Sequence, residues 1–337
     1  IRLVLAFDHR HIFIDPTPDV ARSFAERQRL FNLPRSSWDD YDKSLISKGG
    51  GVYPRSAKSI ALSPEARAVI GITAEELPPL ELLKAILQAP VDLLYNGGIG
   101  TYVKASFETH AQVGDKASDA FRVNGSELRC KVVAEGGNLG CTQNGRIEYA
   151  QKGGLIYTDA IDNSAGVDCS DHEVNIKILL GGVVEAGDLT LKQRNDLLAS
   201  MTDEVGHLVL QDNYYQTQAL DIATHRPLYV LDGQQRLMQW LEGSKRLNRA
   251  IEFLPTDDEI AKRRARKQGL TAPENAVVLA YAKMSVFDEL VASNLPDDPF
   301  YGRALKAYFP QVLTEKFGPA IAAHPLKREI IATFITN

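Results

Sequence analysis

The sequence predicts an α/β protein in which a truncated doubly wound domain is followed by an all-α helical region. In the first half of the 337 residues, short apolar runs alternate with helical patterns, whereas strand signals stop near residue 162. Near-continuous apolar strands that are separated by helices need cover on both faces, so we expect a mostly parallel sheet. We place the boundary between the two domains after residue 175, which gives domains 1–175 and 176–337.

The individual elements follow from apolar runs and helix-start signals. Strands are expected at residues 1–7, 91–95, 131–134 and 155–158. In the same half, helices are expected at 18–31, 76–88 and 144–151, with a further helix beginning at Ser63-Pro64-Glu65 and a Gly-rich connection over 48–60. In the second half, helical periodicity covers 175–185, 190–218, 228–253, 257–268, 273–293 and 303–317. Thr271 and Glu274 have the spacing of a capping box before the helix at 273.

Composition narrows the class of protein. The 38 basic and 43 acidic residues give a net charge of −5, which argues against a nucleic-acid partner. No apolar run approaches the roughly 18 residues that a membrane span needs, so we expect no membrane association. The three cysteines are widely spaced, as is usual for reduced thiols in the cytoplasm. The chain opens without Met inside an expected strand and closes on an apolar-periodic segment, REIIATFITN, with no stop signal after it, so we interpret it as an interior piece of a longer protein.

Three segments rich in Gly, Asn and Asp follow expected strands. They are YNGGIGTY (95–102), AEGGNLGCT (134–142) and DAIDNSAGVDCSDHE (159–173). Open α/β sheets bind ligands at the carboxyl ends of their strands, and glycines let a ligand approach the backbone closely. Together the three segments predict a nucleotide crevice, and the domain is therefore expected to be Rossmann-like. From the first segment we select Asn96, Gly97 and Gly98 as cofactor-binding residues.

The glycine fingerprint of a dinucleotide fold is missing from the chain. Gly98 and Gly100 form a GxG after a strand, but no third glycine follows at the required spacing. What remains is Asp8, at the end of the first expected strand. An acid in that place accepts hydrogen bonds from the adenosine ribose of NAD, or else it caps a turn. The spacing alone leaves both interpretations of Asp8 open.

Longer motifs resemble the large bacterial NAD-specific glutamate dehydrogenases. They include AFDHRHIFIDP (6–16), VDLLYNGGIGTYVK (91–104), KVVAEGGNLGCTQNGRIEYA (131–150), DAIDNSAGVDCSDHEVNIKILL (159–180) and LPDDPFYG (295–302). The resemblance runs in order over essentially the whole chain. In that family the chain is much longer, and the substrate domain precedes the part that corresponds to this one.

The resemblance also implies roles for single residues. Asn138 would lie near the ribose or nicotinamide of NAD, and Asn163 beside the nicotinamide and the substrate amino group. Gly166 would allow close backbone approach, and Ser170 would bind the distal carboxylate of glutamate. The family's catalytic lysine and aspartate belong to the substrate domain, so we assign no catalytic residue here.

Two groups of side chains suggest a metal and are interpreted otherwise. His9 and His11 have strand-alternate spacing, which is more often that of capping or solvated histidines. Cys169, Asp171, His172 and Glu173 form a second group, in which acids near a helix start are better explained by the helix dipole. We therefore expect no metal site.

The reaction that the resemblance implies is oxidative deamination of L-glutamate by NAD+, which yields 2-oxoglutarate and ammonia. The isolated chain is expected to be inactive, because the phosphate-binding turn and the catalytic lysine lie outside it. The full-length enzyme is expected to be a cytoplasmic homo-oligomer. Two alternatives remain open: a helical oligomerisation or regulatory module, and a dehydrogenase of another amino acid such as leucine or phenylalanine.

Overall fold

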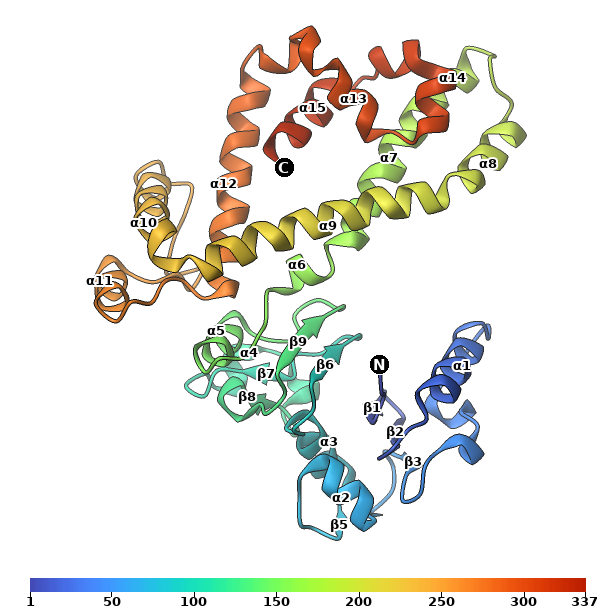
Figure 1. The fold of residues 1–337 in the computed structure, drawn as a ribbon, viewed down its shortest axis with the longest axis vertical. Helices are drawn as coiled ribbons and strands as arrows, with labels where there is room; N and C mark the ends of the chain where they lie inside the picture. The colour runs from blue at the N-terminus through green and yellow to red at the C-terminus, as the bar shows by residue number, and fades with distance from the viewer. The chain divides into compact units, whose positions relative to one another are not determined.

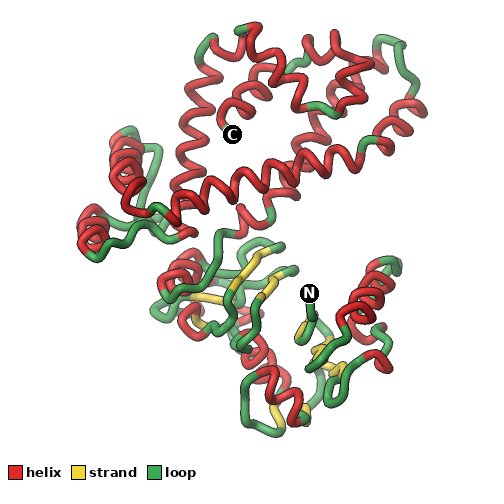
Figure 2. Tube along the Cα trace, viewed as in Figure 1, coloured by secondary structure: helices red, strands yellow, loops and turns green.

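A computed structural model describes all 337 residues, which form two compact units, Ile1–Ile156 and Tyr157–Asn337. The first unit is mixed α/β with several small sheets, and the second is built from helices alone (Figures 1 and 2). The coarse prediction of an α/β part followed by a helical part is therefore confirmed. The division into domains 1–175 and 176–337 stays a prediction.

The first sheet is antiparallel, not parallel as predicted. Strands β1 (Leu5–Phe7), β2 (His11–Ile14) and β3 (Gly51–Pro54) pair in that order, each antiparallel to its neighbour. Only three residues separate β1 from β2, and a parallel pair would need a crossover of about a dozen residues or more. The prediction also missed β3, which lies inside the expected Gly-rich connection.

Two further strand pairs are parallel, one between expected strands and one between strands that the sequence analysis missed. They are β6 (Leu93–Asn96) with β9 (Val132–Glu135), and β7 (Val103–Lys104) with β8 (Val123–Asn124). The fourth expected strand, at 155–158, is reduced to one parallel bridge between Leu155 and Val132. Helix α5 (Gln143–Gln151) connects β9 to this bridge. The sheet that was expected as one body is thus divided into short pieces, of which the β6–β9 pair keeps the parallel register.

Helix α2 (Pro64–Ile70) begins where its capping residues predict. Ser63 accepts a hydrogen bond from the Ala66 amide at 3.0 Å, and Pro64 opens the helix, because its missing N–H is not needed there. The expected helix at 76–88 is shorter, because Glu76 and Leu77 form a strand. The remaining elements are α1 (Val20–Phe31), β4 (Ile60–Ala61), α2 (Pro64–Ile70), β5 (Glu76–Leu77), α3 (Pro79–Leu87) and α4 (His110–Val113).

The second unit contains ten helices. They are α6 (Asp159–Asp162), α7 (Ser164–Glu185), α8 (Leu191–Ser200), α9 (Thr202–His225), α10 (Pro227–Gly243), α11 (Asp257–Ala265), α12 (Ala272–Ala292), α13 (Gly302–Tyr308), α14 (Gln311–Ala322) and α15 (Lys327–Thr336). The capping box is confirmed, because the Glu274 carboxylate accepts from both the amide (2.7 Å) and the hydroxyl (2.8 Å) of Thr271. None of the helices is both long and apolar enough to cross a membrane.

Several expected helix boundaries are wrong. The stretch expected as one helix over 303–317 is divided into α13 and α14. Helix α7 begins at Ser164, eleven residues before the expected start, and the stretch expected as one helix over 190–218 is divided at Met201 into α8 and α9. Helix α10 ends at Gly243, ten residues before the expected end. The segment that contains Gly166 and Ser170 has little helical periodicity. The sequence alone therefore indicated a loop where α7 begins.

Asp257, the first residue of α11, is expected to make the stability of the second unit depend on pH. Its carboxylate accepts from Gln239 (2.9 Å), Arg249 (2.9 Å) and Gln235 (3.0 Å), and these bonds lower its pKa to about 2. An acid whose folded pKa lies below its unfolded value of about 3.9 stabilises the fold above pH ~4 and loses this contribution as pH falls toward 2.

The variant Asp257→Asn is therefore expected to lower the free energy of unfolding at pH 7. The loss is about 1 kcal/mol, because the side chain is half exposed and solvent screens the charge. Urea unfolding at pH 7 and pH 3 measures the difference, which should shrink at the lower pH. Asp258→Asn, one residue on, is the control and should change the free energy of unfolding by no more than about 0.5 kcal/mol. An equal loss for Asp257→Asn at both pH values would contradict the prediction.

Candidate functional site

The carboxyl ends of β6 and β9 bring two of the three predicted glycine-rich segments side by side. Asn96 is opposite Glu135 in the parallel register, and each strand continues into its glycine-rich loop. The backbone carbonyl of Asn96 accepts from the amides of both Gly136 (2.8 Å) and Gly137 (3.0 Å). The predicted juxtaposition of these loops at one sheet edge is therefore present in the fold.

Glycine is required where the two loops touch each other. A Cβ atom on Gly137 would lie 2.5 Å from the Gly98 carbonyl oxygen, and one on Gly140 would lie 1.8 Å from the Asn96 side-chain nitrogen. Real Cβ atoms do not approach other atoms so closely. A Cβ on Gly98 would meet nothing within 4 Å. The loops therefore pack tightly against each other while the Gly98 side of their edge stays open.

A buried ion pair fixes the loop that follows β9. Glu135 is fully buried, and its carboxylate accepts from the Arg146 guanidinium at 2.7 and 2.9 Å. One of its oxygens also accepts from the Cys141 amide at 3.0 Å, at the far end of the loop. The sequence analysis missed this pair, since nothing in the sequence marks which acid and which arginine meet in the core.

The tips of the two loops expose apolar side chains. Ile99 is 97% exposed, Leu139 is 65% exposed, and Tyr95 at the end of β6 is 64% exposed. Leu139 also has a φ of 58°, in the left-handed region that non-glycine residues rarely adopt. Asn138, the residue before it, is exposed on the same loop. An apolar, exposed and locally strained edge of this kind is typical of a ligand-binding loop.

Asp8 is in a turn of the antiparallel sheet, away from the β6–β9 edge in sequence and in strand pairing. Its carboxylate accepts from the amides of Arg10 (2.6 Å) and His11 (2.7 Å), so it caps the turn between β1 and β2. This is the second of the two roles that the sequence left open. Ribose binding by Asp8 stays a prediction. Both turn hydrogen bonds are accepted by the same carboxylate oxygen, Oδ1.

In the second unit, Asn163, Gly166 and Ser170 share one helical stretch. Asn163 ends α6 and precedes α7, and the Gly166 amide donates to its carbonyl at 3.0 Å. The Ser170 hydroxyl donates to the Gly166 carbonyl at 3.2 Å, and both of these residues are exposed. Their spacing of three and four residues places them along one face of the helix. The third glycine-rich segment is therefore helical, and the expectation that it follows a full strand is wrong.

Comparison with known proteins decides the family. Residues 1–223 match the family model described as bacterial NAD-glutamate dehydrogenase, catalytic domain, and residues 267–337 match the model described as glutamate dehydrogenase, C-terminal. The chain belongs to the bacterial NAD-glutamate dehydrogenase family. The resemblance inferred from the motifs is thereby confirmed.

Curated relatives agree with this assignment to the NAD-glutamate dehydrogenases. The chain is similar to NAD-specific glutamate dehydrogenases of Pseudomonas aeruginosa (59% identical over 337 residues), Halomonas elongata (56% over 337) and Mycobacterium tuberculosis (52% over 343). Each match covers 100% of this chain and 21% of the relative. The chain thus spans about a fifth of the length of the relatives that it matches.

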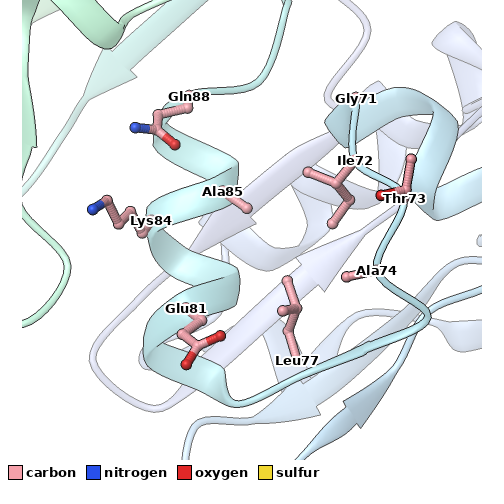
Figure 3. A pocket seen from close by; sticks show the side chains of 9 residues that line it. All are labelled: Gly71, Ile72, Thr73, Ala74, Leu77, Glu81, Lys84, Ala85 and Gln88. Carbon is pink, nitrogen blue, oxygen red and sulfur yellow. The ribbon is translucent and has the colours of Figure 1, made fainter.

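An open surface pocket between α3 and the segment that follows α2 is a poor candidate for the cofactor site of this family member. Figure 3 shows Ile72 and Leu77 facing α3 across the pocket, with few polar groups between them. Cofactor sites need convergent polar groups as well as apolar walls. The lining residues are Gly71, Ile72, Thr73, Ala74, Leu77, Glu81, Lys84, Ala85 and Gln88. The edge formed by β6 and β9 remains the better candidate.

Proposed function

We propose that the protein catalyses the NAD-dependent oxidative deamination of L-glutamate to 2-oxoglutarate and ammonia. The observation that carries this proposal is the pair of glycine-rich loops at the carboxyl ends of parallel β6 and β9, in a chain of the glutamate dehydrogenase family. The parallel bridge at Leu155, reached through α5, extends the same pattern. We therefore also propose that β6, β9 and this bridge belong to a doubly wound, Rossmann-like nucleotide-binding domain.

The loop edge of the first unit has the properties that a dinucleotide needs. The open space at Gly98 and the exposed backbone at Gly97 let a ligand approach the main chain. Asn138 carries an amide that both donates and accepts, and Ile99 and Leu139 offer apolar contact for a flat ring. Asn96 acts mainly by positioning the loops. Its backbone carbonyl accepts from the amides of the second loop, and its side-chain oxygen accepts from the Gly98 amide within its own loop. Bound NAD+ supplies the hydride acceptor.

The start of α7 supplies the proposed substrate contacts. The Ser170 hydroxyl bonds only to a helix carbonyl, and a glutamate carboxylate accepts such a hydrogen bond more strongly because it is charged. Gly166 has open space where a side chain would be, since a Cβ there would meet nothing within 4 Å. We propose that Ser170 binds the distal carboxylate, that Gly166 leaves room for the substrate, and that Asn163 contacts both the substrate amino group and the nicotinamide.

A substrate panel on the complete gene product tests the proposed reaction. We expect rapid NAD+ reduction with L-glutamate and at least a hundredfold lower kcat/KM with L-leucine or L-phenylalanine, because an apolar substrate leaves the carboxylate-binding hydroxyl without a partner. A preference for an apolar amino acid would assign the protein to another dehydrogenase class. An absence of NADH formation with every amino acid would reject the enzymatic proposal.

Ser170→Ala is expected to raise the KM for L-glutamate about tenfold or more, because a hydrogen bond to a charged group contributes about 1.5–3 kcal/mol. The KM for NAD+ should change little. Steady-state kinetics with each substrate varied in turn measure both constants. Ser200→Ala is the matched control, since Ser200 is an exposed serine on α8 whose hydroxyl also donates to a helix carbonyl, that of Leu197, at 2.7 Å. Equal KM values for glutamate in both variants would rule out the proposed role of Ser170.

The exposed face of α9 favours a second function, that of an oligomerisation module. Leu210, Tyr214 and Ile222 are each more than half exposed on this helix. Apolar side chains clustered on an exposed helix mark a contact surface. We propose that the complete gene product is a homo-oligomer in the cytoplasm, where its three cysteines, none of which forms a disulfide, stay reduced. A strict monomer by light scattering at high concentration would reject the oligomer.

A further inference from the structure

Two aspartates and a histidine of the second unit converge between α7 and α9. Asp168 and His172 are one turn apart on α7, and Asp212 is on α9, which packs against it. One carboxylate oxygen of each aspartate and one imidazole nitrogen of His172 lie within 4.8 Å of one another. No residue that we propose for NAD or glutamate binding belongs to this cluster.

His172 is buried in the protein with an unsatisfied polar atom. The residue is 2% exposed, and its Nδ1 is buried without a hydrogen-bond partner. A carboxylate oxygen of Asp168 is buried in the same way. Buried polar groups almost always have partners, so two orphan atoms in one cluster indicate a ligand that satisfies them.

The electrostatic field at the cluster favours an added cation. Burial, together with the negative charges of Asp212 and Asp171, raises the pKa of Asp168 to about 6. Burial also raises the pKa of Asp212 and lowers that of His172. Lys283, on α12, is the one cation that acts on both aspartates, and burial lowers its own pKa. A single half-buried lysine leaves the charges of two nearby carboxylates incompletely compensated.

We propose that Asp168, His172 and Asp212 bind a divalent transition-metal ion such as Zn²⁺ or Mn²⁺. Imidazole nitrogen and carboxylate oxygen are donors that both ions accept, with water in the remaining positions. Ligand atoms about 2.1 Å from one ion lie at most about 4.2 Å apart. The cluster therefore needs to contract by less than about 1 Å, which small side-chain rotations provide.

Neighbouring groups hold the histidine ring in place for this role. The ring stacks on Tyr308 with centroids 4.3 Å apart and an interplanar angle of 18°. The Tyr308 hydroxyl donates to Asp171 at 2.8 Å, and the side-chain amide of Asn175 donates to Tyr308 at 2.9 Å. Supporting contacts of this kind orient metal ligands. A bound ion would join α7 to α9, and so would stabilise the helix that carries Ser170.

Metal titration of the complete gene product, first stripped by a chelator, tests the site. Zn²⁺, Mn²⁺ and Co²⁺ are each titrated alone by calorimetry, and the visible spectrum of the Co²⁺ form reports nitrogen and oxygen coordination. We expect saturable binding of one ion per chain at this site, together with a higher melting temperature. Asp212→Asn and His172→Gln should each weaken this binding at least tenfold, because loss of a ligand costs more than loss of a supporting contact.

Glu173→Gln is the matched control, because Glu173 is adjacent to His172 but points to solvent and pairs with Lys177. This variant should bind the metal like the wild type. If His172→Gln does not fold, as judged by circular dichroism, the more conservative Asp212→Asn decides the question. Absence of saturable binding of all three ions to the wild type would overturn the proposal, as would undiminished binding by Asp212→Asn.

Discussion

Arg146→Met is expected to lower the free energy of unfolding by about 3–5 kcal/mol, because it leaves the Glu135 carboxylate buried without its charge partner. Glu135 is fully buried and Arg146 is 4% exposed, so water cannot replace the lost bonds. The Glu135 carboxylate also holds the Cys141 amide, and the whole loop between them depends on its position. Urea unfolding followed by circular dichroism measures the change.

The exposed ion pair next to the same strand provides the control. Lys131 and Asp92 lie 2.7 Å apart with side chains 77% and 86% exposed. Lys131→Met should change the free energy of unfolding by no more than about 1 kcal/mol, since exposed pairs contribute little. If Arg146→Met cost no more than Lys131→Met, the buried pair would not be what fixes the loop after β9.

Local signals in the sequence predicted the elements with strong local causes. Ser63 and Pro64 define the start of α2, and Thr271 with Glu274 defines the start of α12. The apolar runs that became β6 and β9 were predicted because both strands are short, continuous and followed by glycines. At such positions the capping or turn residue and its effect are only a few residues apart.

Pairing between distant segments could not be predicted in the same way. The antiparallel sheet depends on β3, about forty residues after β2, and its Gly-rich sequence carries no strand signal. The apolar run at 155–158 predicted a strand, yet only Leu155 makes a bridge. An apolar run becomes a strand only if another segment is available to pair with it. The sequence alone does not show which distant segment that is.

The candidate sites show the same difference between local features, which could be predicted, and contacts between distant segments, which could not. The glycine-rich loops after β6 and β9 were predicted, because strand ends and glycines are visible locally. For the metal cluster, His172 was considered with Cys169, Asp171 and Glu173, which are its neighbours in sequence. The residue one helical turn before it, Asp168, would have been the better partner had α7 been expected to start at Ser164. Asp212 could be found only from the packing of α9 on α7.

Gly137→Ala is expected to raise the dissociation constant for NADH at least about fivefold. A Cβ at this position would lie 2.5 Å from the Gly98 carbonyl oxygen, so the two loops must separate. Forced movement of a tightly packed backbone costs about 1–3 kcal/mol, which corresponds to roughly five- to 150-fold in an equilibrium constant. The φ of Gly137 is not in the left-handed region, so the effect comes from the contact and not from backbone strain. NADH fluorescence titration measures the affinity.

Gly243→Ala separates this effect from the general effect of replacing a glycine. Gly243 is exposed at the end of α10, and a Cβ there would meet nothing within 4 Å. Alanine is favoured over glycine in a helix by up to about 1 kcal/mol, so this variant should fold at least as well and bind NADH normally. If Gly137→Ala bound NADH as tightly as Gly243→Ala, the cofactor would not depend on the contact between the two loops. The NAD site would then have to be sought away from the carboxyl ends of β6 and β9.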